Sequence, residues 1–157
     1  MIFIVRFIIV KYELIIKSDD LILIAENLKN EEIIAVDTET TGLDPYTSKV
    51  RLLQIATIEK AYIIDCFFVD SLEPLKPIFD SMKPVKIFHN AKFDIKMLKR
   101  HFGLEFQNIF DTMLASQIVS AGVHNSHNLK DVVFRYLETE IDKSEGRSDW
   151  SGELTAS

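Results

Sequence analysis

The segment AVDTETTGLDP, residues 35–45, decides the fold, because it joins an apolar stretch to two acids, Asp37 and Glu39, one residue apart. Side chains alternate between the two faces of a β-strand, so a strand through this segment points both carboxylates to the same side. Two carboxylates held that close repel each other unless a proton or a cation lies between them. The segment therefore predicts a buried strand that ends in an acidic site.

The composition is that of one globular domain. The chain has 157 residues, of which 47% are hydrophobic and 27% charged, so we expect a single domain over 1–157, with 1–11 as an uncertain lead-in. The net charge of −6 argues against a uniformly basic nucleic-acid binder. The single cysteine, Cys66, can form neither an internal disulfide nor a cysteine metal cluster, which favours a reducing, cytoplasmic location.

The apolar N-terminus does not predict a membrane segment or a membrane partner. Arg6 interrupts it, and no apolar run approaches the ~18 residues that a membrane helix needs. We expect a strand at 12–16, and either an extra strand or a lead-in at 2–10.

The remaining pattern alternates strands and helices. Strands are expected at 33–36, 50–57, 61–65 and 86–89, and helices at 19–30, 72–82, 91–102, 112–121 and 128–137. Short connections predict an antiparallel meander for the three strands between 33 and 65. The expected fold is α/β, with three layers and a mixed sheet of about five strands between helices on both faces.

A third acid belongs to the segment FHNAKFDIKML, residues 88–98. On a helix, Asp94 lies at the edge of an apolar stripe, where a carboxylate is costly unless something satisfies it. If this helix packs beside the first acidic strand, three carboxylates converge, and hard Mg²⁺ or Mn²⁺ fits such oxygen ligands better than zinc does. Taken singly, these acids could instead be a solvated loop start and a helix-edge ion-pair partner, and Asn90 could be a helix cap.

A basic stretch surrounds this third acid. Residues 83–101 carry Asp94 as their one acid, together with Lys83, Lys86, Lys92, Lys96, Lys99 and Arg100. Such a basic rim beside an acidic pocket suits a phosphate backbone that reaches a metal site. The alternative interpretation is an ordinary solvated helix face rich in lysine.

The ordered motifs resemble a known family. The segments DTETTGLDP, VRLLQIA, HNAKFDIKML, DTMLASQIV, HNLKDVVFRYL and SDWSGEL closely resemble the 3′-5′ exonuclease (proofreading) domain of bacterial family A DNA polymerases. That domain belongs to the DEDD, ribonuclease H-like superfamily, which also includes RNase D. The resemblance covers residues 12–157 and implies a ribonuclease H-like fold.

The resemblance also implies a reaction and residue roles. It implies hydrolysis of the terminal phosphodiester at the 3′ end of single-stranded DNA by two metal ions, with release of nucleoside monophosphates. Asp37 would bridge both ions, Glu39 would hold one of them and touch the 3′ end, and Asp94 would serve the second. Leu43 would wedge against the terminal base, Asn90 would help arrange the site, and Thr38 would offer its backbone to the substrate.

One departure from the family pattern concerns the third motif, Tyr-x-x-x-Asp, which occurs nowhere in this sequence. The sequence therefore looks like a domain truncated before that motif, and slow or absent cleavage is expected because a metal ligand and the water-orienting tyrosine are missing. Two alternatives stay open: an RNase D-like RNA exonuclease, and a nucleic-acid-binding or scaffold module without chemistry. A DNA polymerase domain, in the same chain or a separate one, is the expected partner.

Overall fold

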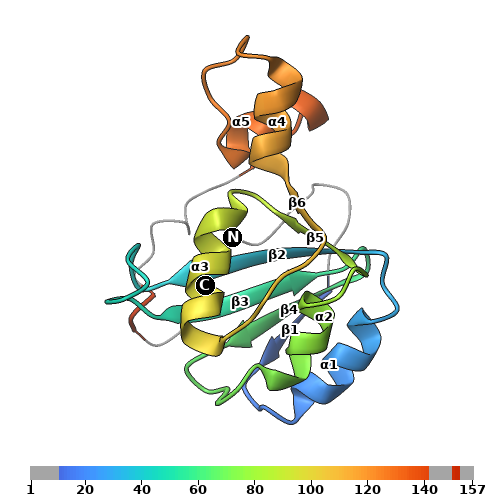
Figure 1. The fold of residues 1–157 in the computed structure, drawn as a ribbon, viewed down its shortest axis with the longest axis vertical. Coiled ribbons are helices and arrows are strands. Elements are labelled where there is room, and N and C mark those ends of the chain that lie inside the picture. The colour runs from blue at the N-terminus through green and yellow to red at the C-terminus, as the bar shows by residue number, and fades with distance from the viewer. Residues whose placement is uncertain (1–10, 142–149, 153–157) are drawn as a thin grey trace.

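The computed structural model describes residues 11–141 and 150–152 and arranges them around one mixed β-sheet (Figure 1). The expectation for residues 2–10 lies outside this described part. Within it the sheet has six strands in the order β1-β4-β3-β2-β5-β6. The strands are β1 (Lys11–Ile15), β2 (Ile33–Thr40), β3 (Val50–Ala56), β4 (Lys60–Asp65), β5 (Val85–Phe88) and β6 (Ile109–Asp111).

The strand directions confirm the predicted meander. β2 pairs antiparallel with β3, and β3 pairs antiparallel with β4. The outer pairs, β1 with β4, β5 with β2, and β6 with β5, are parallel. The sheet has one strand more than predicted, because the extended segment after residue 106 pairs with β5 as the edge strand β6. The predicted α/β class with a mixed sheet is confirmed.

The helices follow the predicted pattern with one exception. They are α1 (Asp20–Leu28), the 3₁₀ turn η1 (Glu73–Leu75), α2 (Lys76–Phe79), α3 (Ala91–Phe102), α4 (Thr112–Ser120) and α5 (Leu129–Leu137). The single helix expected at 72–82 is instead η1 followed by α2. Two prolines three residues apart explain the difference, because neither Pro74 nor Pro77 can donate a backbone hydrogen bond to the preceding turn.

The core lies where α1, α2 and α3 meet the sheet. Leu21 and Leu28 of α1, Leu53 of β3, Phe79 of α2 and Leu98 of α3 are all fully buried in one apolar cluster. Helices α4 and α5 lie together beyond the end of β6, as a projection from the sheet (Figure 1). Of the helices in the described residues, none has both the length and the apolar character that a bilayer crossing requires.

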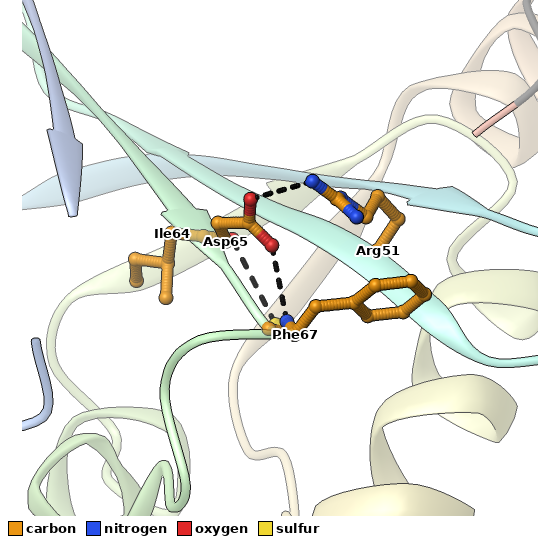
Figure 2. Close-up of polar contacts among 5 residues, drawn as sticks. Arg51, Ile64, Asp65 and Phe67 are labelled. Atoms are coloured by element: carbon orange, nitrogen blue, oxygen red, sulfur yellow. Dashed lines mark hydrogen bonds and ion pairs between the residues drawn. The ribbon is translucent and has the colours of Figure 1, made fainter. Parts of the chain in front are cut away.

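A buried ion pair fixes the end of the sheet next to the acidic strand. The β2–β3 register shifts between Glu39 and Thr40, and Arg51 lies at this irregularity. The Nη2 of Arg51 donates to Oδ2 of Asp65 at 2.8 Å, with the two side chains only 4% and 2% exposed. Figure 2 shows the guanidinium of Arg51 beside the Asp65 carboxylate, and its Cζ lies 4.4 Å from the centroid of the Phe67 ring. The start of β3 is thereby tied to the end of β4.

Removing one partner of this pair should destabilise the fold strongly. Asp65→Ala leaves the Arg51 charge buried and unpaired, so we expect a loss of about 3–5 kcal/mol in the free energy of unfolding. Glu73→Ala is the matched control, because it breaks an exposed pair with Lys76 and should cost at most about 1 kcal/mol. Urea unfolding of both variants measures the difference, and similar small losses would show that the buried pair carries no such constraint.

Candidate active site

Strand β2 places the two acids of the opening segment on one face. Along the strand, Val36 and Thr38 are buried, whereas Asp37 and Glu39 are half-buried. Asp37 lies opposite Gln54 of β3, and Glu39 lies opposite Leu52. The alternation thus confirms that both carboxylates point to the same side. They lie inside the strand rather than after it, because pairing with β3 continues β2 as far as Thr40.

The third acid, Asp94, is held against the same strand by Thr38. β5 pairs with β2 only over Ile33–Ala35, so among the described residues no strand lies next to β2 beyond that point on the β5 side. There the backbone N–H of Thr38 donates to Oδ1 of Asp94 at 3.0 Å, and the Thr38 hydroxyl donates to the same oxygen at 2.6 Å. A carboxylate therefore takes the place of a strand as the partner of this amide.

The pKa values of Asp37 and Asp94 are both raised above the usual value for an aspartate. Burial raises the pKa of Asp37 to about 6, and the nearby charge of Glu39 acts in the same direction. Burial also raises the pKa of Asp94 to about 7; the hydroxyl of Thr38 opposes this rise, and the charge of Asp37 adds to it. The effect of Asp37 on Asp94 shows that the helix and the strand bring acids distant in sequence within electrostatic reach.

The donor chemistry fits a hard divalent cation, although no ligand set is preformed. The charge of Glu39 raises the pKa of Asp37, and the charge of Asp37 raises that of Asp94, so a cation between these acids would relieve their repulsion. Mg²⁺ and Mn²⁺ prefer such oxygen ligands. In residues 11–141 and 150–152, however, no group of three or more His, Cys, Asp or Glu side chains is arranged to hold a metal ion. One ion could therefore contact all three acids only after their side chains turn toward a common point.

The other predicted site residues lie around these acids in different ways. Leu43 lies in the loop after β2 and is 83% exposed, as a residue that meets a substrate base must be. Asn90 precedes α3 in a left-handed conformation, and its side chain does not cap the helix. The amide and hydroxyl of Thr38 are engaged by Asp94, so the structure gives Thr38 a role in positioning that acid. The predicted substrate contacts of these three residues stay predictions.

Asp111 supports the site through two sets of hydrogen bonds, of which only the first, a helix cap, can be expected from the local sequence. Its carboxylate caps α4 by accepting from the backbone N–H groups of Met113 and Leu114 at 2.9 and 3.3 Å. The same carboxylate also accepts from the backbone N–H groups of Asn90 and Ala91 at 3.1 and 2.9 Å. It thus joins the start of α3, the helix that carries Asp94, to the end of β6. This second set of contacts depends on tertiary packing, which no local motif reveals.

The predicted basic rim is smaller than the sequence suggests. Lys86 lies within β5 and is fully buried, its amine donating to the backbone oxygen of Ser81. Lys83 pairs with Glu32, and Lys99 pairs with Glu105. The exposed cations of this stretch without a carboxylate partner in the described residues are Lys92, Lys96 and Arg100.

Comparison with known proteins finds both a matching family and similar sequences. A family model described as "3′-5′ exonuclease" matches residues 12–156. DNA polymerase I of Aquifex aeolicus is 35% identical over 129 residues, which are 82% of this chain and 21% of that protein. Ribonuclease D of Desulfotalea psychrophila is 35% identical over 142 residues, which are 85% of this chain and 37% of that protein.

A solved structure shares the fold. The crystal structure of Escherichia coli RNase D, an exoribonuclease involved in structured RNA processing, superposes with a TM-score of 0.83 at 27% identity. The superposition covers 93% of this chain and 38% of that chain. The ribonuclease H-like fold predicted from the motifs is therefore confirmed, and the chain spans well under half the length of these relatives.

Neutralising Asp94 should stabilise the metal-free protein at high pH. Because its pKa rises from 3.8 to about 7 on folding, its stabilising contribution is full below pH ~4 and is lost as the pH rises through 7. The amide oxygen of Asp94→Asn can still accept from Thr38. We expect this variant to match the wild type at pH 4 and to exceed it at pH 8.5, by at most about 4 kcal/mol. Thermal unfolding in EDTA at both pH values measures this, and a gap that does not grow with pH would contradict it.

Removing Asp111, which accepts hydrogen bonds at the starts of both α3 and α4, should lower the free energy of unfolding about twice as much as removing a residue that caps one helix. Asp111→Ala exposes the N-termini of α3 and α4, and loss of a cap costs about 1 kcal/mol at each helix. Asn128→Ala is the matched control, because Asn128 caps α5 alone through one bond to the Asp131 amide. Urea unfolding of both variants gives the ratio, and equal losses would mean that Asp111 does not act at two helices.

Proposed function

The chain belongs to the 3′-5′ exonuclease family, and on that premise we propose that it removes nucleotides from the 3′ end of single-stranded DNA in a reaction that requires Mg²⁺ or Mn²⁺. The observation that supports this most is the contact between Thr38 and Asp94. It brings a buried acid of α3 to the strand that carries Asp37 and Glu39. Three carboxylates held this close together can bind the cations that such a reaction requires.

We assign each predicted site residue a role in this reaction. Asp37, Glu39 and Asp94 would hold two metal ions, which would activate a water molecule and stabilise the displaced oxygen of the terminal phosphodiester. Both hydrogen bonds from Thr38 go to Oδ1 of Asp94, so Oδ2 is the oxygen that we assign to a metal. The exposed side chain of Leu43 would pack against the terminal base of the DNA. Asn90 would contact the DNA strand next to that base.

The choice of DNA rests on the polymerase relative. DNA polymerase I of Aquifex aeolicus shares 35% identity over 82% of this chain. We propose on the same ground that the domain works beside a DNA polymerase, on the same chain or a separate one. RNA is the second candidate, because ribonuclease D of Desulfotalea psychrophila is equally identical over 85% of the chain.

Cleavage by this chain is expected to be slow. The sequence contains no Tyr-x-x-x-Asp, and the loss of residues that orient metal ligands alone costs about 10–100-fold. The assay must therefore use a molar excess of protein and long incubation, so that a slow nuclease can be told apart from a module that only binds nucleic acid.

The test compares 5′-labelled DNA and RNA oligonucleotides of the same sequence in Mn²⁺. We expect a ladder that shortens from the 3′ end, faster on DNA than on RNA, absent in EDTA and lost in Asp37→Asn. The matched control is Asp70→Asn, since Asp70 is an exposed acid away from the site. A ladder of equal rate in Asp37→Asn would refute the proposal, and faster cleavage of RNA would favour the second candidate.

A further inference from the structure

A pocket of about 310 Å³ is lined by none of the proposed catalytic residues. One wall is the end of the β2–β3 loop and the start of β3, a second follows β4, and the third is the end of α3. The lining residues are Tyr46, Thr47, Ser48, Lys49, Val50, Cys66, Phe67, His101 and Phe102. A volume at the lower end of the range for ligand sites suits one small organic unit rather than a long chain.

The pocket lining contains the exposed rings of Tyr46 and Phe67 together with Lys49, and Arg100 lies outside the lining but next to the Tyr46 ring. Tyr46 is 79% exposed and Phe67 41% exposed. The guanidinium of Arg100 lies 5.6 Å from the centroid of the Tyr46 ring, and the amine of Lys49 lies 5.9 Å from that of Phe67. No ion pair in the described part of the chain joins Lys49 or Arg100 to a carboxylate.

Negative charge is missing from the lining. The chain has 24 acids against 18 lysines and arginines, yet the pocket contains no Asp or Glu. Asp65, the acid nearest along the chain to Phe67, is buried in its pair with Arg51. Burial raises the pKa of the Cys66 thiol to about 12, so this side chain is neutral. The pocket therefore offers aromatic faces, hydroxyls and positive charge to a ligand that is itself aromatic and anionic.

The pocket is rigidly connected to the acidic site. Thr41 and Lys49 close the base of the β2–β3 loop through hydrogen bonds of 3.0 and 2.9 Å. Gly42 lies against Ser48 so closely that a Cβ atom would be 2.5 Å from the Ser48 hydroxyl oxygen. One wall of the pocket thus belongs to the same compact loop that begins directly after Glu39.

The end of α3, which forms the third wall of the pocket, allows the distance between the pocket and the acidic site to be estimated. His101 follows Asp94 by seven residues on α3, so the two lie on nearly the same side of the helix, about 10 Å apart along its axis. Stacked nucleotides rise about 3.4 Å each, so about three of them span this separation.

We propose that this pocket binds one nucleotide unit of the single-stranded substrate, about three nucleotides before the 3′ end, by stacking its base on Tyr46 or Phe67 and pairing its phosphate with Lys49 and Arg100. Stacking on aromatic side chains beside cations is the general way in which proteins hold single strands without reading their sequence. The inference rests on the proposed function, because it assumes that the 3′ end lies at Asp37 and Glu39.

The first experiment measures binding against length. Fluorescence anisotropy in EDTA, which prevents cleavage, gives the affinity of 5′-labelled oligothymidylates of two to eight nucleotides. We expect the affinity to rise about tenfold once the strand exceeds about three nucleotides, and we expect the double variant Lys49→Ala/Tyr46→Ala to lose this rise. The matched control is Lys11→Ala/Tyr12→Ala, which removes an exposed lysine and tyrosine from the start of β1. These residues pair with the first residues of β4, Lys60 and Ala61, at the opposite end of that strand from the pocket. The absence of this rise, or a rise that survives in the pocket variant, overturns the proposal.

The second experiment separates a free nucleotide from a strand. Titration of thymidine monophosphate and of an oligothymidylate of six nucleotides, followed by amide NMR shifts, should perturb Lys49, Phe67 and His101 with both ligands. Shifts confined to the neighbourhood of Glu39 and Asp94 overturn the proposal. If affinity rises with length as expected but no cleavage ladder forms in Mn²⁺, the proposed function is contradicted and the pocket proposal is supported. If cleavage occurs without that rise in affinity, the proposed function is supported and the pocket proposal is contradicted.

Discussion

The structure of the site depends on a single carboxylate oxygen, Oδ1 of Asp94, which accepts two hydrogen bonds from Thr38. This contact joins α3 to β2 at the point where β5 stops and the sheet would otherwise leave an amide unpaired. It also holds a nearly buried acid close to Asp37, which raises the pKa of Asp94. The arrangement therefore satisfies the backbone at the cost of electrostatic strain, and protons or cations relieve that strain.

Two further contacts keep this geometry in place from either side. Asp111 joins the start of α3 to the end of β6, so the turn of helix before Asp94 cannot shift independently of the sheet. The Arg51–Asp65 pair fixes the strand end on the other side of β2. Carboxylates repel one another when they are free to move, so a fold that keeps them close needs support of this kind. Side-chain rotation then remains as the motion by which the acids could meet at an ion.

The sequence predicted the features that follow from local periodicity. The period of two put Asp37 and Glu39 on one face, and the period of 3.6 gave α3 its bounds, which left-handed residues Asn90 and Gly103 confirm. It could not show that β2 continues to Thr40, because that depends on pairing with β3. Nor could it show that Lys86 is buried: a lysine in a short strand looks solvent-facing until its amine is seen to reach the Ser81 carbonyl.

The charges around the β2–β3 loop are separated in a way that bears on the order of binding. Acids concentrate on β2 and the start of α3, whereas the pocket at the other end of the same loop contains none. A phosphodiester at the acidic end meets repulsion from the ionised carboxylates until cations neutralise them, and the raised pKa values of Asp37 and Asp94 mean that protons compete with those cations as the pH falls below about 7. Binding in the pocket carries no such condition. A strand can thus be held near the site in the absence of metal, while its 3′ end enters only after the carboxylates have bound their ions.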